Sequence, residues 1–162
     1  MVFVNEKWND TQAIKGALSV GGRCIAIMPC GLEQIVPQSN KKIAEKIIET
    51  GGCIISEYPQ GTSIQKYQYV ERDKIQSGIS QGIIVVEAER ESGTMHTAEF
   101  ALRQNKRIAC YYNKLLQFSS GNEYLESMKS VNVINSKDDM HQFVDYIVND
   151  SEYQQINLMD LL

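Results

Sequence analysis

The stretch from Gly82 to Leu102 contains residues that could bind an anion. At its centre, Ser92-Gly93-Thr94 combines two hydroxyl groups with a glycine, between a predicted buried strand at Ile83–Val86 and a predicted helix at Thr97–Gln104. Backbone N–H groups and the positive end of the helix dipole both favour a phosphate at a helix start. Open α/β sheets bind ligands at the carboxyl ends of their strands. The sequence therefore predicts a phosphate site where this strand ends.

Strands and helices alternate along most of the chain. Short apolar runs rich in β-branched residues predict strands, and apolar residues at helical spacing predict helices. The predicted strands are Arg23–Met28, Cys53–Ser56, Ile83–Val86, Arg107–Tyr111 and Val131–Ile134, and the predicted helices are Asn40–Thr50, Gln65–Ser77, Thr97–Gln104, Glu123–Lys129 and Asp138–Val148. This alternation predicts an α/β protein with a Rossmann-like open parallel sheet of about five strands and helices on both faces. We expect one domain over residues 1–149 and a C-terminal tail over residues 150–162.

Composition restricts the class of protein. The chain has 162 residues, of which 43% are hydrophobic and 22% are charged, as expected of one globular domain. Its net charge of −4 argues against nucleic-acid binding through overall charge, although a local basic site stays possible. No apolar run approaches the roughly 20 residues that a membrane helix needs, and the N-terminus lacks a signal-peptide pattern. We expect a cytoplasmic protein without a metal or cofactor, since its four cysteines and two histidines show no metal-ligand spacing.

Residues that could catalyse a reaction are present but form no known catalytic pattern. Ser92 and His96 lie close in sequence, but the G-x-S-x-G pattern of a nucleophilic serine is absent. Glu57 and Glu87 each follow a strand, where they could activate water, bind a ribose or bond to loop N–H groups. These residues by themselves leave an enzymatic activity open, and we assign no catalytic residue.

Several segments match the motifs of one family, in that family's order. Ser92 to Ala98 resembles the SGSLITA motif of the DprA/Smf family of bacterial DNA-processing proteins. The other matching segments are Cys30–Leu32 with Val36-Pro37 and Asn40, Gly51-Gly52, Ser56–Gly61, Tyr69–Ile75 with Gly78–Ser80, Val85–Ala88, and Ser120–Asn122. The resemblance covers residues 13–148. The family's initial G-S-R strand-turn and its S-G-x-A-x-G-I-D segment have no counterpart here, so the family's first strands are missing, and its Arg-Asn-Arg is Arg72-Asp73-Lys74.

The resemblance implies a protein that binds single-stranded DNA during DNA processing, recombination and the uptake of DNA by competent cells, and it favours a binding protein over an enzyme. It also implies a homodimer or larger homo-oligomer, with a RecA-type recombinase as partner. The side chains of Arg72 and Lys74 would then neutralise phosphates. The remaining phosphate contacts would come from Gly31, Ser92, Gly93, Thr94 and Thr97, and Tyr58 or Tyr69 could stack on a base.

Two further hypotheses concern the ligand and the tail. The same strand–Gly-Thr–helix arrangement resembles nucleotide-binding relatives that include the cytokinin-activating phosphoribohydrolases, which makes a nucleotide-ligand sensor or a phosphoribohydrolase-like enzyme the alternative. Against that alternative, the P-G-G of their motif is absent and Glu99 lies too far from Thr94. In the tail, Gln155–Met159 resembles the pentapeptide by which bacterial proteins bind the DNA sliding clamp. The other interpretation is an apolar terminus that packs on the domain or on a second subunit.

Overall fold

The computed structural model describes residues 2–3, 9–113 and 119–154. Its strands are β1 (Val2–Phe3), β2 (Ile25–Met28), β3 (Cys53–Ser56), β4 (Gly82–Val85), β5 (Arg107–Tyr111) and β6 (Val131–Ile134). Its helices are α1 (Asn9–Ser19), α2 (Lys41–Glu49) after the short 3-10 turn η1 (Gln38–Asn40), α3 (Lys66–Ile79), α4 (Gly93–Arg103), α5 (Ser120–Glu126) and α6 (Lys137–Gln154).

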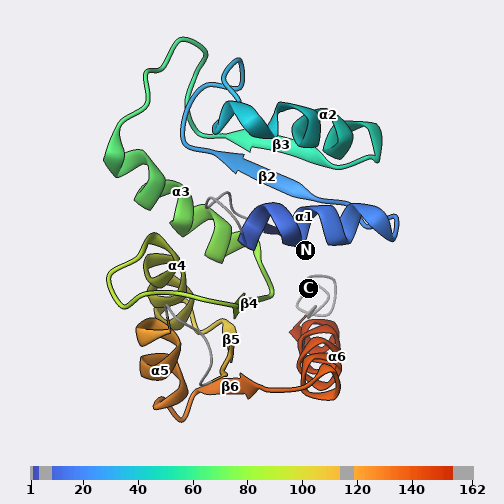
Figure 1. Cartoon of the computed structure of the whole chain (residues 1–162), viewed down its shortest axis with the longest axis vertical. Helices are drawn as coiled ribbons and strands as arrows, with labels where there is room; N and C mark the ends of the chain where they lie inside the picture. The colour runs from blue at the N-terminus through green and yellow to red at the C-terminus, as the bar shows by residue number, and fades with distance from the viewer. Residues whose placement is uncertain (1, 4–8, 114–118, 155–162) are drawn as a thin grey trace, which may run out of the picture.

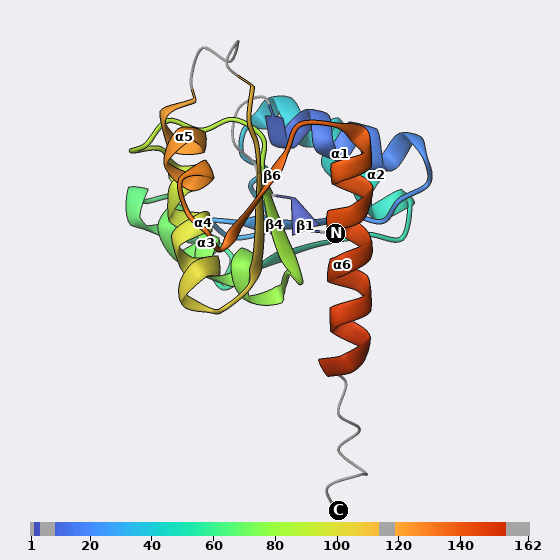
Figure 2. The same cartoon turned by 90° about the horizontal axis from the view of Figure 1, so that it is seen from below.

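The strands form two parallel sheets of three, ordered β1-β2-β3 and β4-β5-β6; Figure 1 labels all of them except β1, which Figure 2 labels. Each sheet has the parallel strands and intervening helices of one half of a doubly wound nucleotide-binding fold. The predicted α/β class and Rossmann-like arrangement are confirmed. The six strands agree with the predicted number of about five, but they form two sheets rather than one, because no described backbone pairing joins β1 to β4.

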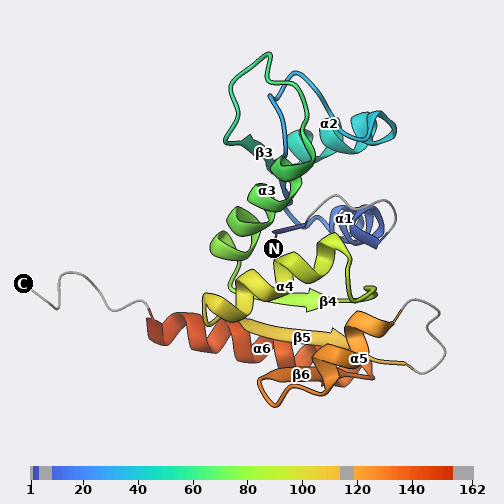
Figure 3. The same cartoon turned by 90° about the vertical axis from the view of Figure 1, so that its left-hand side faces the viewer.

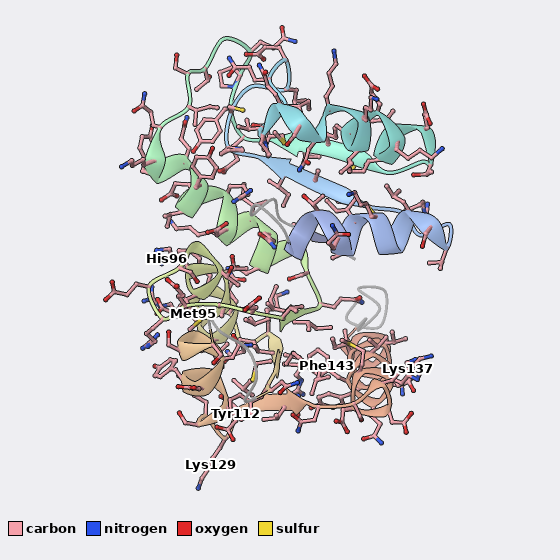
Figure 4. All side chains as sticks on the ribbon, in the orientation of Figure 1. Met95, His96, Tyr112, Lys129, Lys137 and Phe143 are labelled. Carbon is pink, nitrogen blue, oxygen red and sulfur yellow. The ribbon has the colours of Figure 1, made fainter. Side chains whose placement is uncertain are left out.

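Helices cover both faces of the strands. In Figure 2, α1, α2 and α6 lie on one side of the strands, and α3, α4 and α5 lie on the other. Met95, Ala98 and Leu125 pack from α4 and α5 onto one face of the β4–β6 sheet. Phe143 packs from α6 onto its opposite face (Figure 4). Burial on both faces explains why these strands are continuous apolar runs rather than alternating ones.

The predicted and observed elements differ mainly at helix ends. The strands Cys53–Ser56, Arg107–Tyr111 and Val131–Ile134 have the predicted bounds. By contrast, α4 begins at Gly93 rather than Thr97, because Ser92 already has the extended backbone of a residue that precedes a helix. Helix α1 was not predicted, and α6 continues past the predicted domain end at residue 149. The clamp-like segment Gln155–Met159 lies outside the described residues.

The start of α6 is held by reciprocal hydrogen bonds. Asp139 Oδ2 accepts from the backbone N–H groups of Asn135 and Ser136, both at 2.9 Å, and the Asp139 N–H donates to Ser136 Oγ at 3.1 Å. The hydrogen bond from the Asn135 N–H is the largest cause of the lowered pKa of Asp139, followed by that from the Ser136 side chain. The carboxylate form is therefore the one that stabilises the fold.

This cap predicts a stability difference that depends on pH. Because the pKa of Asp139 is lower in the folded chain, its contribution is present above about pH 4, the usual pKa of an aspartate, and is lost as the pH falls through the folded pKa. We expect Asp139→Asn to lower the urea midpoint at pH 7 and to have a smaller effect at pH 3. The same loss at both pH values would contradict the assignment. Asp138→Asn, in the same helical turn, is the control.

Candidate functional site

The Ser92-Gly93-Thr94 loop leads directly into α4, at the carboxyl end of β4. Gly93 is the first residue of the helix, and Ser92 precedes it. The Ser92 hydroxyl donates to the Glu89 carbonyl at 2.8 Å, so it does not cap the helix. The glycine loop and the helix start that the sequence predicts are both observed, and anion binding there stays a prediction. The predicted phosphate contact of Thr97 does not fit the structure. Thr97 lies one turn into α4, and its side chain is buried away from the helix start.

Three residues at the start of α5 hold this loop in place. Ser120 Oγ accepts from the Arg90 N–H at 2.9 Å, and the Gly121 N–H donates to the Ala88 carbonyl at 2.9 Å. A Cβ on Gly121 would lie 2.8 Å from both the Ala88 carbonyl oxygen and the Met95 sulfur, so only glycine permits this approach. The segment Ser120–Asn122, noted in the sequence as a motif, thus fixes the backbone of the loop after β4.

Asn122 is the central residue of this connection and is fully buried. Its Oδ1 accepts from the Ala88 N–H at 2.8 Å. Its Nδ2 donates to the carbonyls of Val86 at 3.1 Å and Tyr111 at 2.7 Å. One amide therefore joins the chain after β4 to the end of β5, and its oxygen and both hydrogens are used.

Arg90 is a cation at this site that the sequence analysis missed. Its guanidinium carbon lies 3.3 Å from the centre of the Tyr124 ring, and Nη1 lies 3.8 Å from Glu99 Oε1. The side chain remains 42% exposed. Stacking on the ring limits its rotamers and orients a charged group beside the start of α4. Sequence offered little signal for this role, because Tyr124 belongs to α5, far along the chain.

Arg72 and Lys74, predicted to act together, lie on different sides of α3. Arg72 is 2% exposed, with Nε 3.1 Å from Asp73 Oδ1 and Nη1 3.5 Å from the Ile27 carbonyl at the end of β2. In this structure its guanidinium has no route to a phosphate in solvent. We therefore correct its role: Arg72 and Asp73 hold α3 against the first sheet, since α3 runs between the two sheets (Figure 3).

Lys74 is the exposed member of the pair. Its Nζ lies 2.6 Å from Glu71 Oε2 and 5.6 Å from the centre of the Phe100 ring on α4. Arg90 contacts Glu99, the neighbour of Phe100. Exposed positive groups from α3 and from the loop after β4 thus both lie along α4, which packs beside α3 (Figure 3).

The tyrosines proposed to stack on bases are partly buried. Tyr69 is half-buried, and its ring lies 5.6 Å from the Arg72 guanidinium. Burial, followed by the charge of Glu57 and the neighbouring Tyr67, raises the pKa of Tyr58. Tyr67, which the sequence analysis did not select, is 62% exposed. Of these three tyrosines, Tyr67 presents the most accessible ring.

Gly31 lies apart from these residues, on the loop after β2 in the other sheet. Ser56 Oγ joins the ends of β2 and β3, donating to the Cys30 carbonyl at 2.7 Å and accepting from the Tyr58 N–H at 3.0 Å. Glu33 Oε1 accepts from the Gly61 N–H at 2.8 Å, which joins the same two loops. The first sheet thus has its own glycine-containing edge.

The described residues show no group suited to metal binding. Within residues 11–113 and 119–149, whose side chains the structure describes, no three His, Cys, Asp or Glu side chains lie where they could hold a metal ion. None of the described helices has the length and hydrophobicity to cross a membrane. Burial raises the pKa of the Cys110 thiol to about 11, which keeps it protonated and unreactive at neutral pH.

Known proteins share both the sequence and the fold. The family model of DNA recombination-mediator protein A matches residues 9–145. Protein Smf of Escherichia coli (strain K12) is 38% identical over 99 residues, which are 61% of this chain and 26% of that protein. DNA processing protein DprA of Streptococcus pneumoniae is 30% identical over 135 residues, which are 83% of this chain and 48% of that protein. The chain thus spans half or less of the length of these curated relatives.

Solved structures agree with this assignment. The X-ray structure of DNA processing protein A from Streptococcus pneumoniae superposes with a TM-score of 0.76 at 28% identity, over 88% of this chain and 50% of that one. The DNA processing protein A of Helicobacter pylori has a TM-score of 0.70 at 21% identity, over 92% of this chain and 80% of that one, which shows a common fold. The order of the motifs, the two parallel sheets and these matches lead to one conclusion: the chain belongs to the DNA recombination-mediator protein A family.

Proposed function

We propose that this chain binds single-stranded DNA as part of DNA processing and recombination. The observation that carries the proposal is the placement of two exposed cations along α4, whose start lies at the carboxyl end of β4. Lys74 comes from α3 and Arg90 from the loop that precedes the helix. Each cation also lies near a carboxylate, Lys74 near Glu71 and Arg90 near Glu99, and a nucleic-acid phosphate would compete with these carboxylates for the two cations.

A single strand suits this surface better than a duplex. Exposed aromatic rings stack on unpaired bases, and Tyr67 presents such a ring on α3, the helix that also carries Lys74. Because the chain has a net charge of −4, the contacts with phosphates must come from local cations rather than from the overall charge. The solved structure of the Helicobacter pylori relative is described as showing a single-stranded DNA binding mode, which supports the same ligand here.

The wider role follows from family membership. We expect the chain to act in the cytoplasm, to self-associate, and to work with a RecA-type recombinase. The sliding clamp remains a candidate partner for Gln155–Met159. A small nucleotide in place of DNA, bound by a sensor or a phosphoribohydrolase-like enzyme, is the alternative that the binding experiment separates.

The binding experiment is a titration of a fluorescent oligo-dT strand at several salt concentrations. We expect the logarithm of affinity to fall as the logarithm of salt rises, because bound cations release counterions from the strand. Lys74→Ala and Arg90→Ala should each weaken binding about three- to tenfold and reduce the salt slope by about one unit. A duplex of the same length should bind less tightly.

Lys129→Ala is the matched control. Lys129 is exposed and points away from the rest of the molecule (Figure 4), so the variant changes net charge equally without touching α4. If Lys129→Ala weakens binding as much as Lys74→Ala, the binding is nonspecific and the proposed surface is wrong. Tight binding of a mononucleotide with no response to the oligo-dT strand would establish the alternative.

A further inference from the structure

The carboxylate of Glu33 lies directly over Gly31, at the carboxyl ends of β2 and β3. A Cβ built on Gly31 would collide with this carboxylate and would lie 2.8 Å from the Pro59 carbonyl oxygen. Any residue other than glycine would therefore displace the carboxylate. Glu33 itself is exposed, so burial does not force its side chain into this position.

A backbone N–H group fixes the carboxylate there. The Gly61 N–H donates to Glu33 Oε1 at 2.8 Å. Gly61 has φ +83°, and the turn closes through the Thr62 N–H and hydroxyl, which both donate to the Pro59 carbonyl at 3.3 and 2.7 Å. A glycine with positive φ is what this tight turn requires, and the turn aims the Gly61 N–H at the space above Gly31.

The arrangement has the features of an anion-binding site, and the Glu33 carboxylate already occupies it. It combines a glycine that allows close approach, a donated backbone N–H, and a position at the carboxyl end of parallel strands. A phosphate oxygen accepts a hydrogen bond from a backbone N–H as a carboxylate oxygen does. The Glu33 carboxylate thus stands where a phosphate oxygen would bind.

We propose that Glu33 is an internal competitor for a phosphate site formed by Gly31 and the Gly61 N–H, and that it sets the affinity of this edge for a DNA phosphate. The part that concerns DNA rests on the proposed function. Because Glu33 is two residues from Gly31, its carboxylate competes at an effective concentration in the range of about millimolar or higher. Phosphate bound at this edge displaces the carboxylate into solvent.

The test compares the unsubstituted chain with two isosteric variants. Glu33→Gln removes the charge of the competitor, and Glu57→Gln removes the same charge from an exposed residue just after β3. The backbone amide signal of Gly61 is followed by NMR while inorganic phosphate replaces chloride at constant ionic strength. Binding of the oligo-dT strand is measured on the same proteins.

We expect Glu33→Gln to increase the affinity for phosphate, read at the Gly61 amide, by about five- to tenfold, since a neutral amide oxygen is the weaker acceptor. Glu57→Gln should change it by less than about twofold, and the oligo-dT affinity should rise more with Glu33→Gln than with Glu57→Gln. Glu33→Ala, which removes the acceptor, should increase phosphate affinity at least as much. Equal effects of Glu33→Gln and Glu57→Gln would overturn the proposal, because net charge alone would explain them.

Two further outcomes separate this proposal from the proposed function. If no variant binds oligo-dT but Glu33→Gln gains phosphate binding at Gly61, the competitor is established and the DNA ligand is wrong. If Glu33→Ala loosens the Gly61 turn and phosphate still leaves the Gly61 signal unchanged, Glu33 is only a structural cap and the competitor is refuted.

Discussion

Asn122→Ala is expected to lower the free energy of unfolding by about 3 to 5 kcal/mol, since each buried polar group left without a partner costs about 1 to 3 kcal/mol. Alanine would leave the Ala88 N–H and the carbonyls of Val86 and Tyr111 without their present partner, all at the junction of β4, β5 and α5. Urea unfolding followed by circular dichroism measures the change.

The control for this prediction is another asparagine in the same half of the molecule. Asn132 lies in β6 with an exposed side chain, so Asn132→Ala should change the unfolding free energy by about 0.5 kcal/mol or less. Equal effects of the two substitutions would contradict the role of Asn122. Because the same amide fixes the loop before α4, we also expect Asn122→Ala to weaken oligo-dT binding under conditions where the variant remains folded.

Asp73→Ala is the second prediction with a large effect. The Arg72–Asp73 pair is 3% and 4% exposed at the side chains, so removal of Asp73 leaves a buried guanidinium without its counter-charge. Removal of one partner of a buried ion pair lowers the free energy of unfolding by about 3 to 5 kcal/mol. We expect a loss of stability of this size, measured by urea unfolding at pH 7.

A double variant separates the cost of an unpaired charge from the loss of packing. Arg72→Met together with Asp73→Ala should recover at least about half of the lost stability, because replacement of both charges by apolar groups is often close to neutral. The exposed pair of Glu71 and Lys74 supplies the control, and Glu71→Ala should cost about 1 kcal/mol or less. If the double variant is no more stable than Asp73→Ala, the buried charge is not the cause of the loss.

Arg72 and Lys74 belong to one sequence motif, but we expect their substitutions to change different properties of the protein. Arg72 contributes to the attachment of α3 to the end of β2, whereas Lys74 faces solvent beside α4. Arg72→Ala should therefore act on stability first, and Lys74→Ala on DNA affinity and its salt dependence. Measurement of both quantities on both variants tests this division directly.

The sequence by itself determined the fold class and the family. Continuous apolar runs such as Ile83–Val86 predict strands buried on both faces. Apolar residues at helical spacing predict the helices that cover these strands. The motif residues around Ser92-Gly93-Thr94 also located the start of α4 to within one turn. These features are local, because a few neighbouring residues specify them. The sequence does not predict α1 although Ile14, Ala17 and Leu18 have helical spacing, because Gly16 lies among them and weakens the helical pattern.

Only the tertiary structure decided which motif residues reach solvent. The helix α3 carries both Arg72 and Lys74, and the faces of that helix are distinguished by how it packs between the two sheets, which no local pattern shows. The contacts of Arg90 with Tyr124, of Asn122 with Ala88, and of Glu33 with Gly61 likewise join residues that are distant in sequence. Their geometry depends on the crossovers that bring the carboxyl ends of the strands together, and for that reason the sequence could name the motifs but not assign their roles.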